Sequence, residues 1–353
     1  MNSYQIALLP GDGIGPEVTA EAVKLLDAVA DKLRDVNFQF NEYPVGAGEY
    51  LKNGDPLPES TIDACRQSDA VLLGAMGLPS VRWPDGREMT PQIDLREKLD
   101  LYNGLRPIYL YAAEDTPLKQ HQAGEIDFLL VRENTEGLFA ARTDPQDQTR
   151  EEARDIMLIT RKGSERICRA AFNEAMRRRK KVTLVDKANV LPSMVLFREI
   201  FKEVSQDFPE VETEVAYVDA AALFLVQRPH TFDVIVTENM FGDILSDLAA
   251  GLVGGMGMAP SGDIGEDCAV FQPSHGTAPD IAGKGLANPV ATILSAAMML
   301  EWLPGERLTG GAGMLYAAVK QTLIDPSQRT SDMGGTLSTS EMGDAILQQL
   351  ENL

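Results

Sequence analysis

Residues 8–18 read LLPGDGIGPEV, a glycine-rich turn between an apolar run and an amphipathic segment. The run at 4–9 is typical of a buried strand, and residues 16–33 have the periodicity of a helix with Pro16 in its first turn. The dinucleotide-binding fingerprint needs a small residue where Pro16 stands, and no acidic residue clearly ends the next strand. The stretch therefore predicts a tight strand-to-helix turn and disfavours an ordinary Rossmann cofactor turn.

Strands and helices alternate along the rest of the chain. Apolar runs predict further strands at 36–43, 69–76, 126–131, 181–186, 211–218 and 232–237. Because helical stretches lie between most of them, the order is typical of an α/β fold with a substantially parallel sheet. The polar segment 143–155 lacks core residues, so it is a linker, a surface excursion or an arm that reaches another subunit.

Composition limits the class of protein. A chain of 353 residues with 44% hydrophobic and 24% charged residues is typical of a soluble enzyme of one or two domains. Its formal charge of −21 repels nucleic acid and anionic membranes, so an anionic substrate requires a local cluster of arginines. The three cysteines form no CxxC pair and the three histidines have no ligand spacing, which disfavours a zinc site, a disulfide framework and a metal-dependent hydrolase. Without a signal-peptide pattern or an apolar run of ~18 residues, the expected location is cytoplasmic.

The segment 237–255, TENMFGDILSDLAAGLVGG, carries two carboxylates four residues apart. On a helix Asp243 and Asp247 project from one face, while neighbouring leucines and isoleucine form an apolar face. Two such oxygen ligands suit Mg²⁺ or Mn²⁺, although the same spacing also occurs on an ordinary solvated helix face.

Three arginines and two strand-end residues are further candidates. Arg96 and Arg106 lie in LREKLDLYNGLRP, and Arg132 ends a predicted strand; guanidinium groups bind carboxylates in bidentate fashion, so the three together suit a di- or tricarboxylate. Lys187 follows one strand, where loss of water favours a catalytic base, and Asp219 follows another.

Residues 271–289, FQPSHGTAPDIAGKGLANP, form a glycine-containing loop before an apolar helix. In such a loop Asp280 is suited to accept hydrogen bonds from ribose hydroxyls and to repel a 2′-phosphate. If this is a cofactor loop, it favours NAD over NADP.

In this order the motifs resemble the β-decarboxylating dehydrogenase family, which includes isopropylmalate, isocitrate, homoisocitrate and D-malate or tartrate dehydrogenases. Six stretches carry the resemblance over essentially the whole chain: LLPGDGIGPE, LREKLDLYNGLRP, VRENTEG, VDKANVL, TENMFGDILSD and HGTAPDIAGKGLANP. It implies an isopropylmalate/isocitrate dehydrogenase-like, non-Rossmann α/β fold of two domains. Residues 1–100 with 252–353 would form the larger, cofactor-side domain, and residues 101–251 the smaller domain with the dimer interface and the metal and substrate residues.

The resemblance also implies a homodimer with shared active sites and a role for each candidate. Three residues match the arginines that bind the malate carboxylates: Arg96, Arg106 and Arg132. Asp243 and Asp247 match the ligands of Mg²⁺ or Mn²⁺ from one subunit, and Asp219 matches the ligand from the partner. Lys187 matches the partner lysine that takes part in proton transfer from the substrate hydroxyl. The adenosine-binding loop of the NAD-dependent members is matched by His275, Gly276, Ala278, Asp280, Ile281 and Asn288.

Two positions depart from the family pattern. Phe139 stands where the family normally has a tyrosine that donates a proton or connects to the donor, and phenylalanine has no hydroxyl to donate. Either water or another side chain protonates the enol, or oxidation proceeds without obligatory decarboxylation, or the chain is a regulatory ligand-binding paralogue. Gln272 replaces a glutamate of many relatives, which removes a negative charge close to the cofactor.

Substrate choice is expected to depend on the residues before Arg96. Isopropylmalate enzymes have leucines there, whereas isocitrate enzymes resemble Ser-x-Asn at the spacing of Thr90 and Gln92. Thr90 and Gln92 therefore predict an (R)-malate with a small or polar C3 group, in the D-malate, tartrate, isocitrate or homoisocitrate class, and not isopropylmalate.

Overall fold

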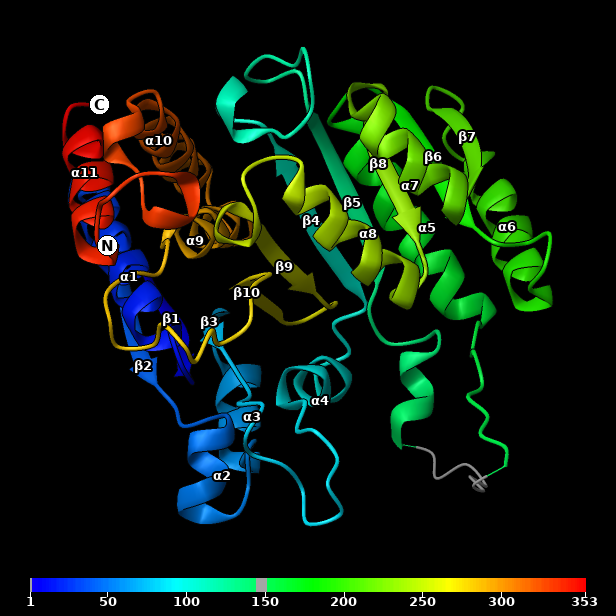
Figure 1. Cartoon of the computed structure of the whole chain (residues 1–353), viewed down its shortest axis with the longest axis horizontal. Helices are drawn as coiled ribbons and strands as arrows, with labels where there is room; N and C mark the ends of the chain where they lie inside the picture. Colours follow the sequence, from blue (N-terminus) through cyan, green and yellow to red (C-terminus); the bar gives the residue numbers. More distant parts are fainter. Residues whose placement is uncertain (1, 144–150) are drawn as a thin grey trace. The chain divides into compact units, whose positions relative to one another are not determined.

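The computed structural model describes residues 2–143 and 151–353, so residues 144–150 of the predicted polar segment lie outside the described residues. The chain divides into two compact units (Figure 1). We call Met1–Leu99 with Gly254–Leu353 the terminal unit, and Asp100–Val253 the central unit. Each is described by itself.

The terminal unit contains five neighbouring strands in the order β2-β1-β3-β10-β9. Their bounds are β1 Asn2–Gly11, β2 Val36–Glu42, β3 Ala70–Ala75, β9 Pro260–Ile264 and β10 Ala269–Pro273. All neighbours pair in parallel except β9 and β10, which are antiparallel. Buried side chains along β1 and β3 form much of the core of this unit.

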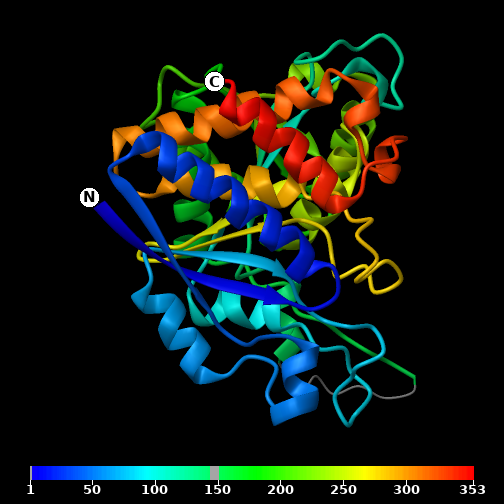
Figure 2. The same ribbon diagram turned by 90° about the vertical axis from the view of Figure 1, so that its left-hand side faces the viewer.

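Helices cover both faces of these strands (Figure 2). One face carries α1 Gly15–Leu33, α9 Val290–Trp302, α10 Glu306–Leu323 and α11 Thr339–Glu351. The other carries the shorter helices α2 Ala47–Asn53 and α3 Glu59–Gln67, and α4 Pro91–Lys98 follows farther along the chain. Helix α9 is buried from Val290 to Leu300 because it is apolar on all sides and lies between the strands and α10.

The turn between β1 and α1 has the geometry that its sequence predicts. Pro16 stands in the first turn of α1, and Gly13 has φ of +60°. A Cβ at Gly13 would lie 2.0 Å from the carbonyl oxygen of Thr277, while the Ile14 amide donates to that oxygen at 2.9 Å. Glycine is therefore required both for the backbone conformation and for the close approach of the loop that contains Thr277.

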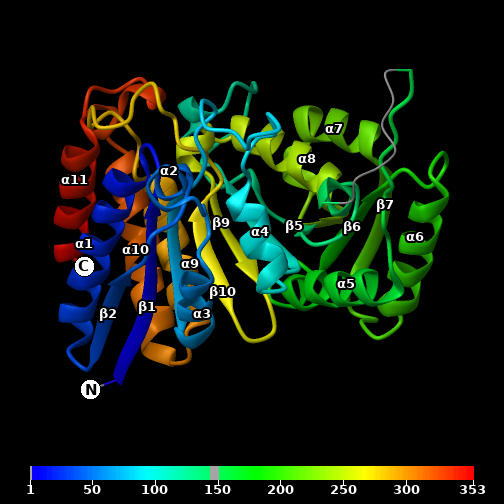
Figure 3. The same ribbon diagram turned by 90° about the horizontal axis from the view of Figure 1, so that it is seen from below.

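The central unit has the strand order β4-β5-β8-β6-β7. Its strands are β4 Asn103–Tyr109, β5 Asp127–Glu133, β6 Lys181–Asp186, β7 Glu212–Tyr217 and β8 Val234–Thr237. Its helices are α5 Arg161–Met176, α6 Pro192–Ser205, α7 Val218–Gln227 and α8 Asn239–Gly251. Figure 3 shows α5 and α6 on one face of the strands and α7 and α8 on the other, and each pair of helices packs on its own apolar cluster.

The predicted α/β class is confirmed, and most strand pairs within the two units are parallel, in agreement with the predicted substantially parallel sheet. Pairs β4–β5 and β9–β10 are antiparallel. Strands β4, β9 and β10 were not predicted. Poor strand formers occur in β4 (Pro107) and in β9 (Pro260, Gly262 and Asp263), and β10 is a short strand that ends in Pro273. Among the described residues, no helix is both long and apolar enough to cross a membrane.

Candidate active site

The two predicted metal-ligating carboxylates lie one turn apart on α8. The helix begins after Glu238, whose carboxylate accepts hydrogen bonds from the amides of Met240 at 3.1 Å and Phe241 at 2.7 Å. This cap fixes where α8 starts and therefore which residues share a face. The pKa of Asp247 is raised because surrounding protein removes part of its water and because Asp243 repels it.

Arg132 on β5 binds directly to the start of α8. Its Nε and Nη2 donate to the Asn239 side-chain oxygen at 3.0 and 2.8 Å, and its Nη1 donates to Asp243. The contact arises because β5 runs parallel to β8 with Arg132 opposite Thr237, immediately before α8. One predicted carboxylate-binding arginine thus touches one predicted metal ligand.

Arg106 belongs to the same group of charges. It lies on β4, is 4% exposed, and donates from Nη1 to the Leu105 carbonyl oxygen at 3.0 Å. The positive charges of Arg132 and Arg106 both oppose the upward shift of the Asp247 pKa. The central unit therefore brings together two of the three predicted arginines and both α8 carboxylates.

Phe139 packs against this group. It begins a short 3-10 turn, η2 Phe139–Thr143, and its ring centroid lies 5.3 Å from the guanidinium carbon of Arg132. An aromatic face at this distance attracts a cation. The ring therefore supports the arginine, although it has no hydroxyl for proton transfer.

Lys187 and Asp219 form a separate pair. Lys187 follows β6, Asp219 lies in the first turn of α7, and the Lys187 Nζ donates to Asp219 at 2.7 Å. This hydrogen bond lowers the pKa of Asp219 below its usual value. Across the described residues of one chain, no three histidine, cysteine, aspartate or glutamate side chains form a group that could hold a metal. Asp219 therefore does not complete a metal site with Asp243 and Asp247 of its own chain.

The third predicted arginine belongs to the terminal unit. Arg96 lies in the last turn of α4 and donates from Nε to the carboxylate of Asp263 at 2.8 Å. Thr90 is the N-cap residue of α4, and the side-chain oxygen of Gln92 is buried with no hydrogen-bond partner in the part of the chain that the structure describes.

The predicted adenosine loop surrounds a cavity of about 280 Å³ in the terminal unit. Its lining combines apolar side chains with a few polar ones: Ile14, Gly257, His275, Ile281, Leu286, Ala287, Asn288, Ser331 and Asp332. The Nε2 atom of His275 is buried and has no hydrogen-bond partner among the described residues, and burial lowers the pKa of this histidine. An apolar cavity with an unpaired imidazole nitrogen fits an adenine ring, which offers ring nitrogens and an amino group.

Other members of the predicted loop lie around this cavity or near it. Asn288 donates to Asp332 at 3.1 Å and accepts from the Val290 amide at 3.0 Å, which fixes its side chain. Ile281 packs with Ile14, Val18 and Ala287. The loop residues outside the lining are Gly276 and Asp280, which are exposed, and Ala278, which has φ of +38°.

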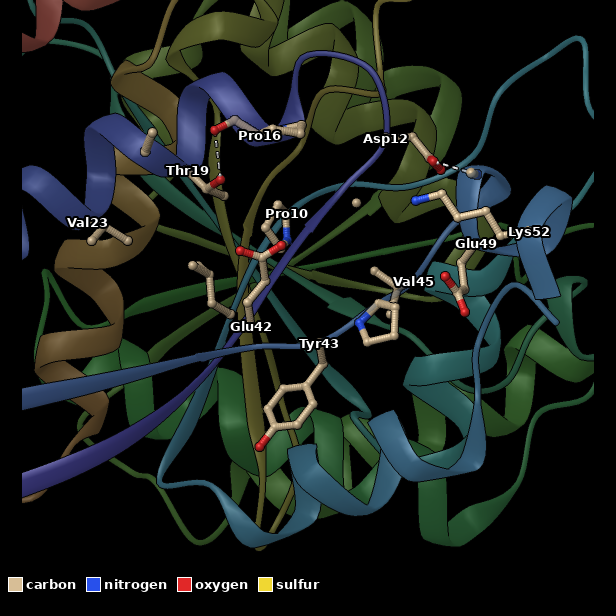
Figure 4. A pocket seen from close by; sticks show the side chains of 15 residues that line it. Pro10, Asp12, Pro16, Thr19, Val23, Glu42, Tyr43, Val45, Glu49 and Lys52 are labelled. Atoms are coloured by element: carbon tan, nitrogen blue, oxygen red, sulfur yellow. Dashed lines mark hydrogen bonds between the residues drawn. The ribbon is translucent and has the colours of Figure 1, made fainter.

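Asp12, in the turn between β1 and α1, organises a different part of the terminal unit. Its buried carboxylate accepts from the amides of Ala47 at 2.7 Å, Gly48 at 2.8 Å and Gly77 at 2.8 Å. It therefore ties the turn to the start of α2 and to the loop after β3. A second cavity, of about 510 Å³, lies beside Asp12 and extends to Glu42 and Tyr43 (Figure 4).

The residues that bind the predicted arginines were not themselves predicted from the sequence. Asn239 binds Arg132 through its oxygen, and its amide nitrogen donates to the Glu136 carbonyl at 3.0 Å. Asp263 binds Arg96, and Glu133 beside Arg132 is buried, which raises its pKa to about 7. Asn239 could have been predicted as a site residue because it lies in the TENMFGD motif, whereas no motif in the sequence contains Asp263.

Curated relatives match this chain along its full length. The 3-isopropylmalate dehydrogenase of Moorella thermoacetica is 47% identical, with 99% of each chain covered. The enzyme of the same name from Aquifex aeolicus is 42% identical, covering 100% of this chain and 99% of the relative. A third, from Priestia megaterium, is 43% identical, covering 99% and 96%.

These relatives contradict the predicted substrate class. An (R)-malate with a small or polar C3 group, to the exclusion of isopropylmalate, is the wrong prediction, because the relatives are named for isopropylmalate. The prediction gave Thr90 and Gln92 the same weight, but residues 91–98 are helical. At helical spacing Ile93 and Gln92 are the neighbours of Arg96, three and four positions before it, whereas Thr90 only caps the helix. The prediction of a small or polar C3 group gave too little weight to the apolar side chain of Ile93.

Solved structures and a family model agree with this similarity. The crystal structure of isocitrate dehydrogenase from Methylococcus capsulatus is 40% identical with a TM-score of 0.88, and covers 98% of this chain and 99% of its own. A β-decarboxylating dehydrogenase from Thermococcus kodakarensis in the apo form is 39% identical with a TM-score of 0.82, and covers 99% and 96%. The family model described as isocitrate/isopropylmalate dehydrogenase matches residues 5–346. This chain therefore belongs to the isocitrate/isopropylmalate dehydrogenase family.

Proposed function

We propose that this protein oxidises 3-isopropylmalate at C2 with NAD as the hydride acceptor and releases CO₂ from the resulting β-keto acid. The observation that carries the proposal is the contact of Arg132 with Asp243, one turn before Asp247 on α8. A guanidinium group that can bind a carboxylate therefore lies beside two carboxylates that can bind a metal. A 2-hydroxy acid chelated through its hydroxyl and carboxylate would need this combination.

The arginines bind and orient the substrate. Arg132 and Arg106 are buried at 3% and 4% exposure, so their charges are poorly screened and attract carboxylates strongly. Arg96 supplies the third guanidinium group. Together they offset the repulsion between a dianionic substrate and a protein of formal charge −21.

Asp243 and Asp247, with Asp219 of the partner subunit, would hold Mg²⁺ or Mn²⁺. When bound, the metal lowers the pKa of the substrate hydroxyl as a Lewis acid and stabilises the enolate left after loss of CO₂. The Arg132–Asp243 hydrogen bond fits this assignment, because it fixes the position of one proposed ligand beside a proposed substrate-binding arginine.

Lys187 would take the hydroxyl proton at its Nζ in the partner's active site. Its hydrogen bond to Asp219 at 2.7 Å holds the Nζ beside the third ligand, so the two residues would enter the neighbouring site together. The Nζ would take up the proton as a neutral amine, which has the lone pair that this step needs. Phe139 supplies no proton to the enol carbon, so the proton that ends the reaction comes from water or from another group.

The terminal unit would hold NAD at the cavity that contains His275, Asn288 and Ile281. The unpaired Nε2 of His275 fits a hydrogen bond with adenine, and the exposed Asp280 is suited to the ribose hydroxyls. A carboxylate there would repel a 2′-phosphate, which supports NAD over NADP.

A second copy of the chain would complete the site. Leu223 and Val226 on α7 and Ile244 on α8 are 51%, 45% and 58% exposed although they are apolar. These helices lie on the same face of the central unit (Figure 3). Such a surface is suited to an isologous interface, and a dimer would also supply a third carboxylate, which the described residues of one chain do not bring to Asp243 and Asp247.

A substrate panel tests the function. We expect NADH formation with 3-isopropylmalate in the presence of Mn²⁺, with about one CO₂ per NADH, and loss of activity when a chelator removes the metal. NADP⁺ should support a much lower kcat/KM than NAD⁺. The control is Arg132→Lys, which keeps the charge but loses the two-point hydrogen bonding and should raise the KM for the substrate. A higher kcat/KM for D-malate, tartrate or isocitrate than for 3-isopropylmalate would refute the proposal.

A further inference from the structure

Lys187 lies in a group of charged and aromatic side chains at the carboxyl ends of β6 and β7 in the central unit (Figure 1). The Tyr217 ring centroid lies 5.7 Å from the Lys187 Nζ and 5.3 Å from the guanidinium carbon of Arg198 on α6. Arg198 in turn donates to both carboxylate oxygens of Asp186, from Nε at 2.7 Å and from Nη2 at 2.6 Å. The Tyr217 ring is therefore in contact with two cationic side chains, one of which is the proposed base.

The register of two parallel strands brings these residues together. Asp186, the last residue of β6, is paired with Tyr217, the last residue of β7. Paired residues on neighbouring strands point to the same face of the sheet, and Arg198 reaches this pair from α6. Lys187 directly follows Asp186, while Asp219 comes two residues after Tyr217, in the first turn of α7. The pairing that places Tyr217 beside Arg198 thus also brings Lys187 to Asp219.

The backbone around Lys187 is fixed by Asp186. Its fully buried carboxylate accepts a hydrogen bond from the Ala188 amide at 3.0 Å in addition to those from Arg198. A buried carboxylate is costly unless it is paired and hydrogen-bonded, so the ion pair holds Arg198 in place. The hydrogen bonds to Asp186 raise the pKa of Arg198, and Tyr217 adds to this rise.

The side chain of Lys187 needs more than one contact to be held in position. Its ion pair with Asp219 leaves 24% of the lysine side chain and 69% of the aspartate side chain exposed. Ion pairs between exposed groups are screened by water and contribute little, and lysine has a flexible four-carbon stem. An aromatic face attracts a cationic nitrogen within about 6 Å of the ring centroid and offers the carbon stem an apolar surface. The Tyr217 ring supplies such a second contact.

We propose that Tyr217 is a positioning residue for Lys187, and that its ring, held against Arg198, keeps the Nζ beside Asp219. The ring acts through its face, so phenylalanine can take its place and an aliphatic residue cannot. This inference rests on the proposed function, since it takes Lys187 as the group that accepts the hydroxyl proton of the substrate.

Steady-state kinetics of two variants test the role of the ring. In Tyr217→Leu the Nζ loses its alignment, so kcat should fall about 10-fold while KM for 3-isopropylmalate stays within about twofold of wild type. Tyr217→Phe retains the aromatic face and should keep kcat within about threefold of wild type. A role in stability alone would lower the Tm of Tyr217→Leu without this split between kcat and KM.

Chemical labelling gives a readout that does not depend on turnover. Acetic anhydride is added to the intact protein without substrate, and acetylation of Lys187 is followed by peptide mass spectrometry. Because the ring covers one side of the Nζ, the labelling rate in Tyr217→Leu should exceed the wild-type rate by at least about twofold, and Tyr217→Phe should match wild type.

Val215→Ala is the matched control, because Val215 lies two residues before Tyr217 on β7 and is 40% exposed. It should leave both kcat and the labelling rate of Lys187 unchanged. If Tyr217→Leu does not fold, Tyr217→Met replaces it in both experiments, since methionine fills similar space without a ring.

The inference fails if the aliphatic variant keeps the wild-type kcat or labelling rate, or if Tyr217→Phe loses as much kcat as the aliphatic variant. A different result would refute the proposed function instead: no NADH from 3-isopropylmalate with the wild-type enzyme, or a wild-type kcat in Lys187→Ala.

Discussion

Phe139 packs against Arg132 but cannot take part in proton transfer. Its ring lies 5.3 Å from the Arg132 guanidinium carbon and is half-buried. A tyrosine would present the same face to the arginine and add a hydroxyl at the ring edge. A phenylalanine at this position therefore supports Arg132, the proposed substrate-binding residue, but offers no proton donor.

Phe139→Tyr should raise kcat, with NADH and CO₂ increasing together, if reprotonation of the enol limits the reaction. General acid catalysis contributes about 10²–10⁴-fold, so even partial alignment of the new hydroxyl would be measurable. The two products are followed in parallel, NADH by absorbance and CO₂ by trapping. Phe139→Leu is the control, because it removes the ring and should raise KM through Arg132. Equal rates of both products in Phe139→Tyr and wild type would exclude a limiting protonation.

Gln272 is a residue whose role depends on a partner that is distant in the sequence. The family pattern identified Gln272 as a departure, but its side chain binds Asp263, which no motif identified. A substitution close to a cofactor was expected to affect the nicotinamide. That expectation stays a prediction, and the structure adds that the Gln272 side chain donates to the carboxylate that binds Arg96.

Among the elements, α8 connects the two proposed metal ligands, Asp243 and Asp247, to Arg132. Arg132 crosses the first turn of α8 at Gly242, where an added Cβ would lie 2.7 Å from the Arg132 Cγ. The glycine therefore allows the helix and the side chain to approach closely enough for Arg132 to reach Asn239 and Asp243. The hydrogen bonds between Arg132 and α8 therefore require a residue without a side chain at position 242.

Gly242→Ala should displace Arg132 and raise KM for 3-isopropylmalate about 10-fold or more, with a loss of about 1–3 kcal/mol in the free energy of unfolding. Steady-state kinetics and denaturant unfolding measure the two effects. Gly251→Ala on the same helix is the matched control, since nothing lies within 4 Å of its added Cβ. It should leave KM unchanged and stabilise the protein by about 0.5–1 kcal/mol. Similar kinetics for the two variants would contradict the role of Gly242.

For the whole molecule, the main question is whether one chain contains a complete site. Lys187 and Asp219 pair with each other, while Asp243 and Asp247 lie with Arg132 and Arg106. Within the described part of one chain no three acidic or other ligating side chains form a metal site. This separation supports a site shared between two subunits.

Mixing two inactive variants tests the shared site. Lys187→Ala and Asp243→Asn should each be inactive as homodimers. In a heterodimer of the two, one site contains both mutations and the other contains none. Random assortment of differently tagged subunits on co-expression should therefore restore about a quarter of the wild-type activity per total protein. If each site came from one chain, the mixture would remain inactive.

Much of the fold followed from local patterns. The turn after β1, the helix that begins at Pro16 and the strands at 126–131 and 181–186 are where the sequence predicted them, because apolar periodicity and proline act within a few residues. The assignment of Arg106, Arg132, Asp243 and Asp247 to one site came from motif resemblance and stays a prediction, although the structure brings these four together.

Residue chemistry and the order of elements are local properties, so the amino-acid sequence alone was sufficient to establish the α/β class and the family. The contacts that orient the side chains are not local. Arg132 reaches Asp243 across 111 positions, and Arg96 reaches Asp263 across 167. These pairs exist because strand register and helix packing bring distant segments together, and a sequence pattern does not encode register at that range. The partners of the arginines were therefore apparent only once the chain was folded.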